Sequence, residues 1–274
     1  MPVELKQGEV SRDRSIDPET PPVLEMRGVS KSYGRVAALI DVDFEVFAGE
    51  VVALVGDNGA GKSTLVKAIA GTHQIDSGEI LIDGKPVVFS SPTEASRRGI
   101  ETVYQDLALC DNLDVTANLY LGREMKMGGG PLLDNVAMEV KAREVVAGLA
   151  ATLPQLDRSV SSLSGGQRQA IAVARAALWG SRLVLLDEPT AALGVAQTAM
   201  VYDLVRRLKA SGLALVVVTH NMADVFAIAD RIVVLRLGRN AGTFDASTTD
   251  PDRVVAAITG SDTISATSAG ENLQ

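Results

Sequence analysis

The sequence lacks the features of several classes of protein. Its 274 residues include one cysteine, Cys110, so an internal disulfide is excluded and a reducing compartment is indicated. No apolar run approaches the roughly 18 residues that a membrane-spanning helix needs, and the N-terminus has no apolar signal segment. Positive charge is also scarce, with 26 Lys and Arg against 34 Asp and Glu and a net charge of −8. We therefore expect a soluble, intracellular chain that binds no nucleic acid.

The composition favours a folded chain of ordinary size. Apolar residues make up 46% of the sequence, which argues against disorder, and 274 residues suffice for one large α/β domain or two small ones. Residues 1–22 mix both charges with prolines and show no apolar period, so we expect a flexible N-terminal segment. Residues 261–274 form a polar, flexible tail. The folded domain is expected over residues 23–260.

A glycine-rich segment, GDNGAGKST, lies between an apolar run (VVALV) and a helical pattern (LVKAIAG). It matches the phosphate-binding pattern G-x-x-x-x-G-K-[ST] in the strand-to-helix context that the pattern requires. Glycine lets the backbone bring its N–H groups to phosphate oxygens, and the helix start that follows favours an anion. A glycine-rich turn without a nucleotide is the alternative, which the flanking strand and helix disfavour. The predicted loop residues are Gly56, Asp57, Asn58, Gly59, Ala60, Gly61, Lys62, Ser63 and Thr64.

Two carboxylates follow another apolar run of the sequence. RLVLLDEPT reads as a buried strand that ends at Asp187 and Glu188, and parallel sheets bind ligands at this end of their strands. Asp187 suits Mg²⁺, and Glu188 suits orienting and deprotonating a water molecule. Two adjacent acids also occur as a charge pair at the start of a helix, and that alternative stays open here.

Three further residues lie at the ends of predicted strands. Gln105 ends GIETVYQD and can lend its amide oxygen to Mg²⁺, and His220 ends LALVVVTH and can bond a γ-phosphate. Tyr33 lies near the end of the first strand and can stack on a nucleotide base. Taken alone, Gln105 is more often a surface residue and His220 a satisfied histidine. For Tyr33, packing on its own sheet is the less favoured alternative.

A helical insertion follows Gln105, and a second helix start follows the insertion. The pattern is helical over about residues 107–178, and LSGGQ lies within it. Ser164 is a plausible helix N-cap, and Gly165 and Gly166 expose backbone N–H groups before a helix that runs from Gln167 to Leu178. This second anion-binding helix start has no Lys or Mg²⁺ ligand of its own. Further along, RIVVLRLGR is predicted as the final strand, and PDRVVAAITG as a short helix.

In this order, Tyr33, GDNGAGKST, Gln105, LSGGQ, LVLLDEPT and His220 resemble the ATPase subunit of an ABC transporter over about residues 23–260. LSGGQ between a phosphate loop and a strand that ends in Asp-Glu is far more specific for this family than the loop alone. The resemblance implies an α/β fold: a P-loop core with a mainly parallel sheet, an N-terminal antiparallel β subdomain and the α-helical insertion.

The resemblance also implies roles for the motif residues. Tyr33 would stack on adenine, Lys62 and the loop amides would hold the phosphates, and Ser63, Gln105 and Asp187 would serve Mg²⁺. Glu188 would be the base toward the attacking water, and His220 would contact the γ-phosphate. ATP would lie between two copies of the chain in a head-to-tail homodimer, so that Ser164, Gly165, Gly166 and Gln167 bind the ATP of the partner.

Two segments most resemble the single-domain ATPases of bacterial monosaccharide importers, of the ribose, xylose and fructose type. They are GIETVYQDLALCDNLDVTANLYLGRE and DEPTAALG. This implies membrane permease subunits as partners, a peripheral place at the cytoplasmic face of the membrane, and an extracytoplasmic sugar-binding protein as an indirect partner. The alternatives are the ATPase of another ABC importer or an exporter, and a soluble ABC protein without a transport role.

One position departs from the family pattern. Relatives usually carry Asp where this chain has Gly194, at the end of the segment Ala191-Ala192-Leu193-Gly194. Gly194 has no carboxylate to offer across a dimer, which puts in doubt the coupling between the two sites rather than hydrolysis. The sequence names neither the sugar nor the permease.

Overall fold

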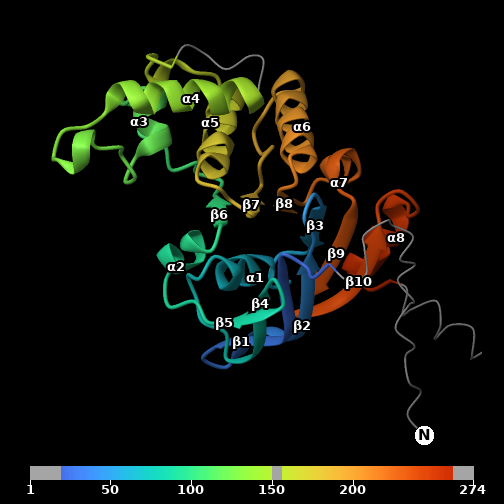
Figure 1. Ribbon diagram of the computed structural model, residues 1–274. Helices are drawn as coiled ribbons and strands as arrows, with labels where there is room; N and C mark the ends of the chain where they lie inside the picture. The colour runs from blue at the N-terminus through green and yellow to red at the C-terminus, as the bar shows by residue number, and fades with distance from the viewer. Residues whose placement is uncertain (1–19, 150–155, 262–274) are drawn as a thin grey trace, which may run out of the picture.

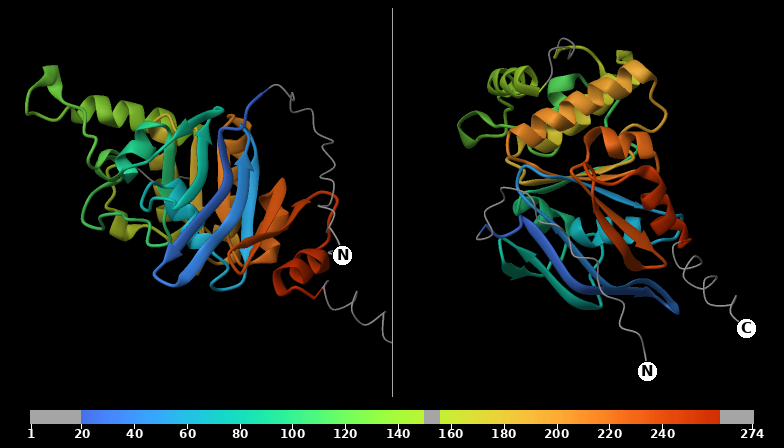
Figure 2. Two further views of the ribbon diagram at one scale, coloured as in Figure 1. Left: turned by 90° about the horizontal axis from the view of Figure 1, so that it is seen from below. Right: turned by 90° about the vertical axis from the view of Figure 1, so that its right-hand side faces the viewer.

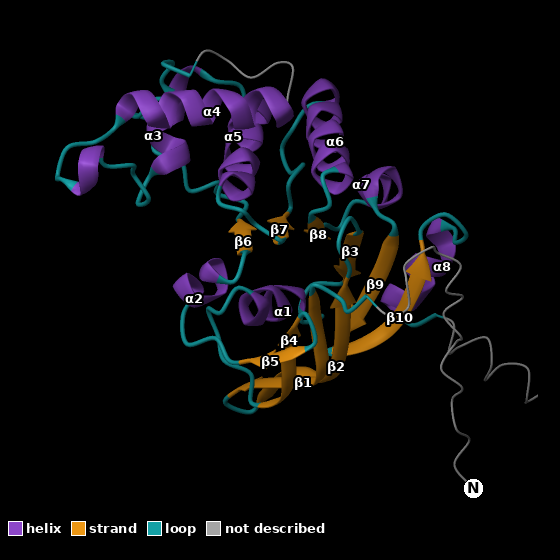
Figure 3. Cartoon of the chain, viewed as in Figure 1, coloured by secondary structure: helices purple, strands orange, loops and turns teal. Residues whose placement is uncertain are grey.

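The computed structural model describes residues 20–149 and 156–261. Most of the predicted flexible segments, 1–22 and 261–274, lies outside the described residues. Within them, the chain forms two sheets with helices between and around them (Figures 1 and 3). No described helix has both the length and the apolar content that crossing a membrane would require.

The first sheet is antiparallel and has the strand order β2-β1-β4-β5. Its strands are β1 (Leu24–Tyr33), β2 (Val36–Val46), β4 (Ser77–Ile82) and β5 (Lys85–Val87). The β4–β5 hairpin turns at Asp83 and Gly84, both of which have positive φ (51° and 72°). Two left-handed residues suit a two-residue turn because their twist matches that of the strands.

The second sheet has the order β10-β9-β3-β8-β7-β6 and is parallel except for β10. Its strands are β3 (Val51–Gly56), β6 (Ile100–Val103), β7 (Leu183–Asp187), β8 (Ala214–Val218), β9 (Arg231–Arg236) and β10 (Arg239–Asp245). Strands β3 and β8 are buried along their whole length and β7 along all but its last residue. Burial on both faces explains their uninterrupted apolar sequences.

The prediction that RIVVLRLGR is the final strand is wrong. The chain turns at Leu237 and Gly238 and returns as β10, antiparallel to β9. Because β10 lies at the sheet edge and none of its residues is fully buried, its sequence RNAGTFD carries no apolar pattern that would have marked it.

Helix α1 (Lys62–Ile69) joins the two sheets into one core. Its buried side chains Leu65, Val66 and Ile69 pack in one cluster with residues of β1, β2, β3, β7 and β8. Figure 1 shows α1 between the antiparallel strands and the parallel ones. The start of α1 is therefore held from both sides.

The remaining helices divide into an insertion and a set that covers the parallel sheet. The insertion contains α3 (Val115–Tyr120), α4 (Asn135–Leu149) and α5 (Gly165–Leu178), with 3₁₀ turns at Met127–Gly129 and Val160–Ser162. It has a small core of its own, which includes Leu119, Tyr120 and Ile171. The other helices are α2 (Pro92–Arg97), α6 (Val195–Ala210), α7 (Met222–Ile228) and α8 (Pro251–Thr259).

Figure 2 shows the insertion on the side of the molecule away from β10 and α8. The antiparallel sheet, the mainly parallel sheet and the helical insertion together confirm the fold class predicted from the sequence.

Candidate functional site

The predicted site residues of four segments lie at one edge of the parallel sheet. Strands β3, β8, β7 and β6 are neighbours, and their carboxyl ends lie level because Leu54 pairs with Val218, Asp187 with Val218, and Val103 with Leu186. The segments that leave these strands contain the glycine-rich loop, His220, Glu188 and Gln105. The carboxyl edge of a parallel sheet is where such folds bind ligands.

Two glycines of the loop are required by close contacts. Gly56 has φ 151°, and a Cβ there would lie 2.2 Å from the carbonyl oxygen of Leu235. Gly61 has φ 106°, and its Cβ would lie 2.6 Å from the carbonyl oxygen of Ala38. A side chain at either position would displace backbone, so the loop has this shape only with glycine there.

Lys62 folds back into the loop. Its Nζ donates hydrogen bonds to the carbonyl oxygens of Gly56 (2.7 Å) and Asp57 (3.0 Å). Burial lowers the pKa of Lys62, while Glu188, Asp57 and Asp187 oppose that shift. A phosphate in the loop would stabilise the ammonium in the same way as these carboxylates.

Asp187 is the last residue of β7 and is held in an unfavourable electrostatic position. Burial and the neighbouring Glu188 raise the pKa of Asp187, and Lys62 and Lys67 oppose the shift. A divalent cation beside Asp187 would relieve this cost. Hydroxyl, amide and carboxylate oxygens, from Ser63, Gln105 and Asp187, are ligands that suit Mg²⁺.

No described group of three or more His, Cys, Asp or Glu side chains could hold a metal ion by itself. Magnesium at this edge would therefore take further ligands from nucleotide phosphates and water, as is usual for this ion.

Glu188 and His220 form a pair across the edge of the sheet. The Oε1 atom of Glu188 lies 2.8 Å from Nδ1 of His220, and the Glu188 side chain is 19% exposed against 77% for His220. Glu188 has a left-handed backbone, with φ 50°, and its N–H donates to the carbonyl oxygen of Val218 at 2.9 Å. Because Nδ1 contacts Glu188, Nε2 is the ring nitrogen of His220 that remains for another partner.

Gln105 and Tyr33 are less constrained than this pair. Gln105 lies two residues beyond β6 and is exposed. Tyr33 ends β1 in the antiparallel sheet and is 43% exposed. The Tyr33 ring stands edge-on to His73 with centroids 5.6 Å apart, and Lys31 Nζ lies 5.8 Å from the ring centroid.

The start of α5 is closed by its own side chains. The Oγ of Ser164 accepts a hydrogen bond from the N–H of Gln167 (3.3 Å), and Gln167 Oε1 accepts one from the N–H of Ser164 (3.0 Å), which makes a capping box. A Cβ at Gly166 would lie 2.9 Å from the side chain of Gln197 on α6. Among the residues that the structure describes, no hydrogen bond or ion pair joins 164–167 to 56–64.

Gly194 is the N-cap residue of α6 and has an ordinary backbone, with φ −74°. A Cβ placed there would meet no atom within 4 Å. The structure therefore gives no steric reason for glycine at this position.

Sequence reasoning missed Asp224. This residue lies in α7, is 2% exposed, and accepts hydrogen bonds from side chains near both Glu188 and His220. An acid in an otherwise apolar helix four residues after His220 is the signal that would have marked it.

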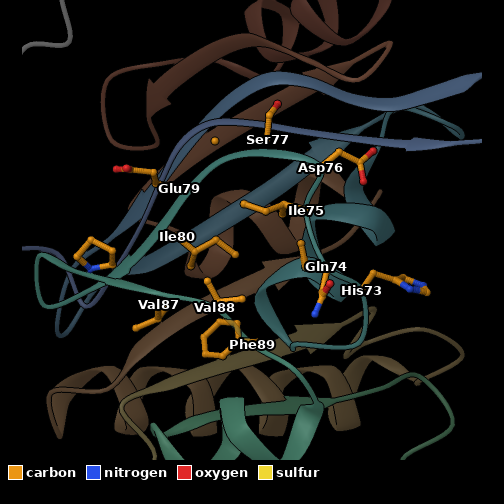
Figure 4. A pocket seen from close by; sticks show the side chains of 13 residues that line it. His73, Gln74, Ile75, Asp76, Ser77, Glu79, Ile80, Val87, Val88 and Phe89 are labelled. Atoms are coloured by element: carbon orange, nitrogen blue, oxygen red, sulfur yellow. The ribbon is translucent and has the colours of Figure 1, made fainter.

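A pocket of about 350 Å³ lies elsewhere, between the end of α1 and the β4–β5 hairpin, and none of the predicted site residues lines it. Figure 4 shows the side chain of His73 at its edge, pointing away from Ile75, Ile80 and Phe89. One residue that lines the pocket, His73, contacts Tyr33 of the predicted site.

Comparison with known proteins places this arrangement in context. The family described as ABC transporter matches residues 39–191. The chain is 49% identical over 224 residues to the fructose import ATP-binding protein FrcA of Rhizobium meliloti, covering 80% of this chain and 86% of that protein. It is 46% identical over 217 residues to the xylose/arabinose import ATP-binding protein XylG of Sulfolobus acidocaldarius, covering 79% and 86%.

A solved structure shares the fold at a greater distance. A dimeric ATP-binding cassette in a post-hydrolysis state, bound to ADP and phosphate, superposes with a TM-score of 0.67 at 27% identity. The match covers 81% of this chain and 98% of that one.

Proposed function

This chain belongs to the ABC transporter family, and we propose that it hydrolyses ATP to drive the import of a monosaccharide. The observation that carries the ATPase part is the meeting of the glycine-rich loop, Asp187, the Glu188–His220 pair and Gln105 at one sheet edge. The names of two relatives, a fructose and a xylose/arabinose import ATP-binding protein at 49% and 46% identity, support the sugar.

In the proposed mechanism, the loop binds the phosphates and positions them against the sheet edge. The residues of the loop are Gly56 to Thr64, with the backbone N–H groups and Lys62 as donors. Lys62 would exchange its two carbonyl partners for phosphate oxygens. Tyr33 would stack on adenine, since nearly half of its surface is open.

Glu188 is the proposed general base. Its carboxylate would orient a water molecule and take its proton as the water attacks the γ-phosphate. The Nδ1 bond between His220 and Glu188 would fix the imidazole so that Nε2 points at the γ-phosphate. Ser63, Gln105 and Asp187 would hold Mg²⁺, which when bound neutralises charge on the phosphate oxygens.

The proposed assembly is a head-to-tail homodimer. Residues 164–167 have no hydrogen bond to the loop of their own chain and no Lys or carboxylate for a nucleotide of their own. We infer that they complete the site of a second copy, as the dimeric state of one related cassette suggests.

We place this dimer at the cytoplasmic face of the membrane, bound to permease subunits, with the helical insertion transmitting the motion. A sugar-binding protein would act on the other side of the membrane.

Reconstitution tests the cargo directly. The chain and its permease subunits are placed in liposomes, and ATP turnover is measured with the matching binding protein loaded with a pentose, a hexose or an amino acid. We expect stimulation by a pentose or hexose alone. Stimulation by the amino acid alone would refute the sugar while leaving the ATPase assignment intact.

A further inference from the structure

Asp224 is a buried carboxylate with four side-chain donors around it. It lies in α7 and is 2% exposed. Its Oδ1 accepts hydrogen bonds from the hydroxyl of Tyr202 and from Asn221 Nδ2 (3.0 Å), and its Oδ2 accepts from the hydroxyls of Thr190 and Thr219 (3.4 Å). A buried charge persists only where donors of this kind compensate it.

Three of the four donors come from the two segments that carry the proposed catalytic pair. Thr190 lies two residues after Glu188, while Thr219 and Asn221 flank His220 on both sides. The backbone N–H of Asn221 also donates to the Thr219 hydroxyl at 3.1 Å. This hydrogen bond spans His220 and constrains the backbone on both sides of it. One carboxylate thus binds both segments.

The fourth donor belongs to neither segment. Tyr202 lies in α6 and anchors Asp224 from the side of the helix. Burial and the hydrogen bond to Asp224 raise the pKa of Tyr202 to about 12, so its hydroxyl remains a donor throughout the neutral range. Tyr202 offers a contact of the same chemistry that touches neither Glu188 nor His220.

The backbone conformation of Glu188 explains why its segment needs to be held by Asp224. A residue other than glycine at φ 50° is strained and keeps that conformation only where its surroundings hold it. Four contacts do so: the Glu188 N–H to the carbonyl of Val218, the Ala191 N–H to the carbonyl of Glu188, the Glu188 side chain to His220, and Thr190 to Asp224. Two of these contacts reach buried residues, Val218 of β8 and Asp224 of α7.

We propose that Asp224 is a positioning residue for ATP hydrolysis, which fixes Glu188 and His220 relative to each other by binding the segments that carry them. The inference rests on the proposed function, because it assumes that Glu188 and His220 act on ATP. Asp224 itself is buried and touches no substrate.

The test compares two variants that each remove one hydroxyl from the same carboxylate. Thr190→Val and Tyr202→Phe are close in shape to the parent, and each removes one hydrogen bond from a hydroxyl to this carboxylate. We expect Thr190→Val to lower kcat roughly tenfold or more, the scale of one hydrogen bond to a charged group, with KM for ATP nearly unchanged. Tyr202→Phe should lower the melting temperature by about as much as Thr190→Val does, because each loses one hydrogen bond. It should leave kcat within about twofold of the parent.

Two additional arms make the result decisive. Asp224→Asn, which keeps the shape and part of the hydrogen bonding, should retain more turnover than Asp224→Ala at matched thermal stability. Backbone hydrogen exchange on the full-length chain should quicken in residues 188–194 and 219–221 for Thr190→Val, but not for Tyr202→Phe. This readout does not depend on catalysis.

Equal effects of Thr190→Val and Tyr202→Phe on kcat and on exchange would overturn the proposal and leave Asp224 a purely structural residue. Glu188→Gln, assayed beside them with the permease subunits present, separates this failure from failure of the proposed function. If Glu188→Gln turns over like the parent, the proposed function fails, and the exchange data alone decide whether Asp224 holds the two segments.

Discussion

The two helix starts predicted to meet phosphate differ in how they are built. No side chain caps α1, its N-cap residue is Gly61, and the ammonium of Lys62 is folded into the loop. The start of α5 is closed by a reciprocal capping box between Ser164 and Gln167. The start of α1 therefore leaves its backbone N–H groups for an anion, as the proposed function requires, whereas the start of α5 is capped by its own side chains.

The surroundings of the two starts differ in the same sense. At the sheet edge, Asp187 has a raised pKa, Lys62 a lowered pKa, and Glu188 a strained backbone. Around α5, Gly165 and Gly166 lie close to Leu193 and Gln197, and a Cβ on either glycine would come within 3.1 and 2.9 Å of those side chains. Strain and perturbed pKa values gather where chemistry is expected. This contrast favours a site whose chemistry lies at the sheet edge and whose second wall, residues 164–167, is supplied by a partner.

The largest effect should come from Glu188→Gln at the sheet edge. We expect ATP turnover to fall by about 10²-fold or more, the scale for losing a general base, with ATP binding retained. Glu79→Gln, on the exposed surface of β4, is the control and should turn over normally. Steady-state ATPase and nucleotide-binding assays check both, and near-normal turnover of Glu188→Gln would place the chemistry elsewhere.

Asp187→Asn should separate stability from activity. The raised pKa of Asp187 means that the folded state disfavours the charged carboxylate, so folding loses stability as the pH rises from the ordinary carboxyl range through the raised value. The substitution should raise the melting temperature at neutral pH, with a gain that shrinks as the pH falls, while turnover drops by about tenfold or more from the loss of a magnesium ligand.

A control with the opposite sign exists in the antiparallel region. A hydrogen bond from Lys31 lowers the pKa of Asp76, so Asp76→Asn should lose stability at neutral pH, and the difference from the parent should vanish at acid pH. Thermal unfolding at several pH values compares the two. If Asp187→Asn follows the same trend as Asp76→Asn, the electrostatic account of the sheet edge is wrong.

Ser164→Ala probes the second helix start. Loss of the capping box should destabilise the chain by about 1 kcal/mol and weaken ATP-dependent dimerisation several-fold, with ATP binding to the single chain unchanged. Ser211→Ala, which removes a 2.7 Å hydrogen bond from the Ser211 hydroxyl to the carbonyl of Leu208 at the C-terminal end of α6, is the matched control. Weaker ATP binding by the single chain would mean that Ser164 serves its own nucleotide.

Gly194→Asp is the smallest change predicted. Asp is a better N-cap than glycine by a few tenths of a kcal/mol, and no neighbouring atom obstructs it. We expect slightly higher stability and a changed dependence of turnover on ATP concentration. Gly180→Asp is the contrast. A Cβ at Gly180 would also meet open space, but the backbone there has φ 69°, so this substitution should lower the stability of the fold by about 1 kcal/mol.

Much of the fold could be read from the sequence because its strongest signals are buried ones. VVALV, LVLLD and ALVVV became β3, β7 and β8, and Ser164 caps α5 as predicted. What was missed is short or at an edge: β10 is polar, and α2 and α7 span six and seven residues. Elements of that kind are defined by tertiary contacts rather than by periodicity.

The sequence predicted which residues form the candidate site but not which of them contact each other. Motif spacing identified Lys62, Glu188 and His220, yet nothing in the sequence shows that His220 bonds Glu188 or that Lys62 folds onto the carbonyl of Gly56. Asp224 was missed for the same reason, since its four donors lie on α6 and on two separate loops.

Mixing two inactive variants tests the split site most directly. Lys62→Ala disables the loop of one chain, and Ser164→Arg disables the α5 start of the other. A mixed dimer pairs the intact loop of one with the intact α5 start of its partner, so the account predicts ATP turnover well above the sum of the separate proteins. If light scattering shows that mixed dimers form and turnover stays at that sum, each chain builds its site alone and the central claim is wrong.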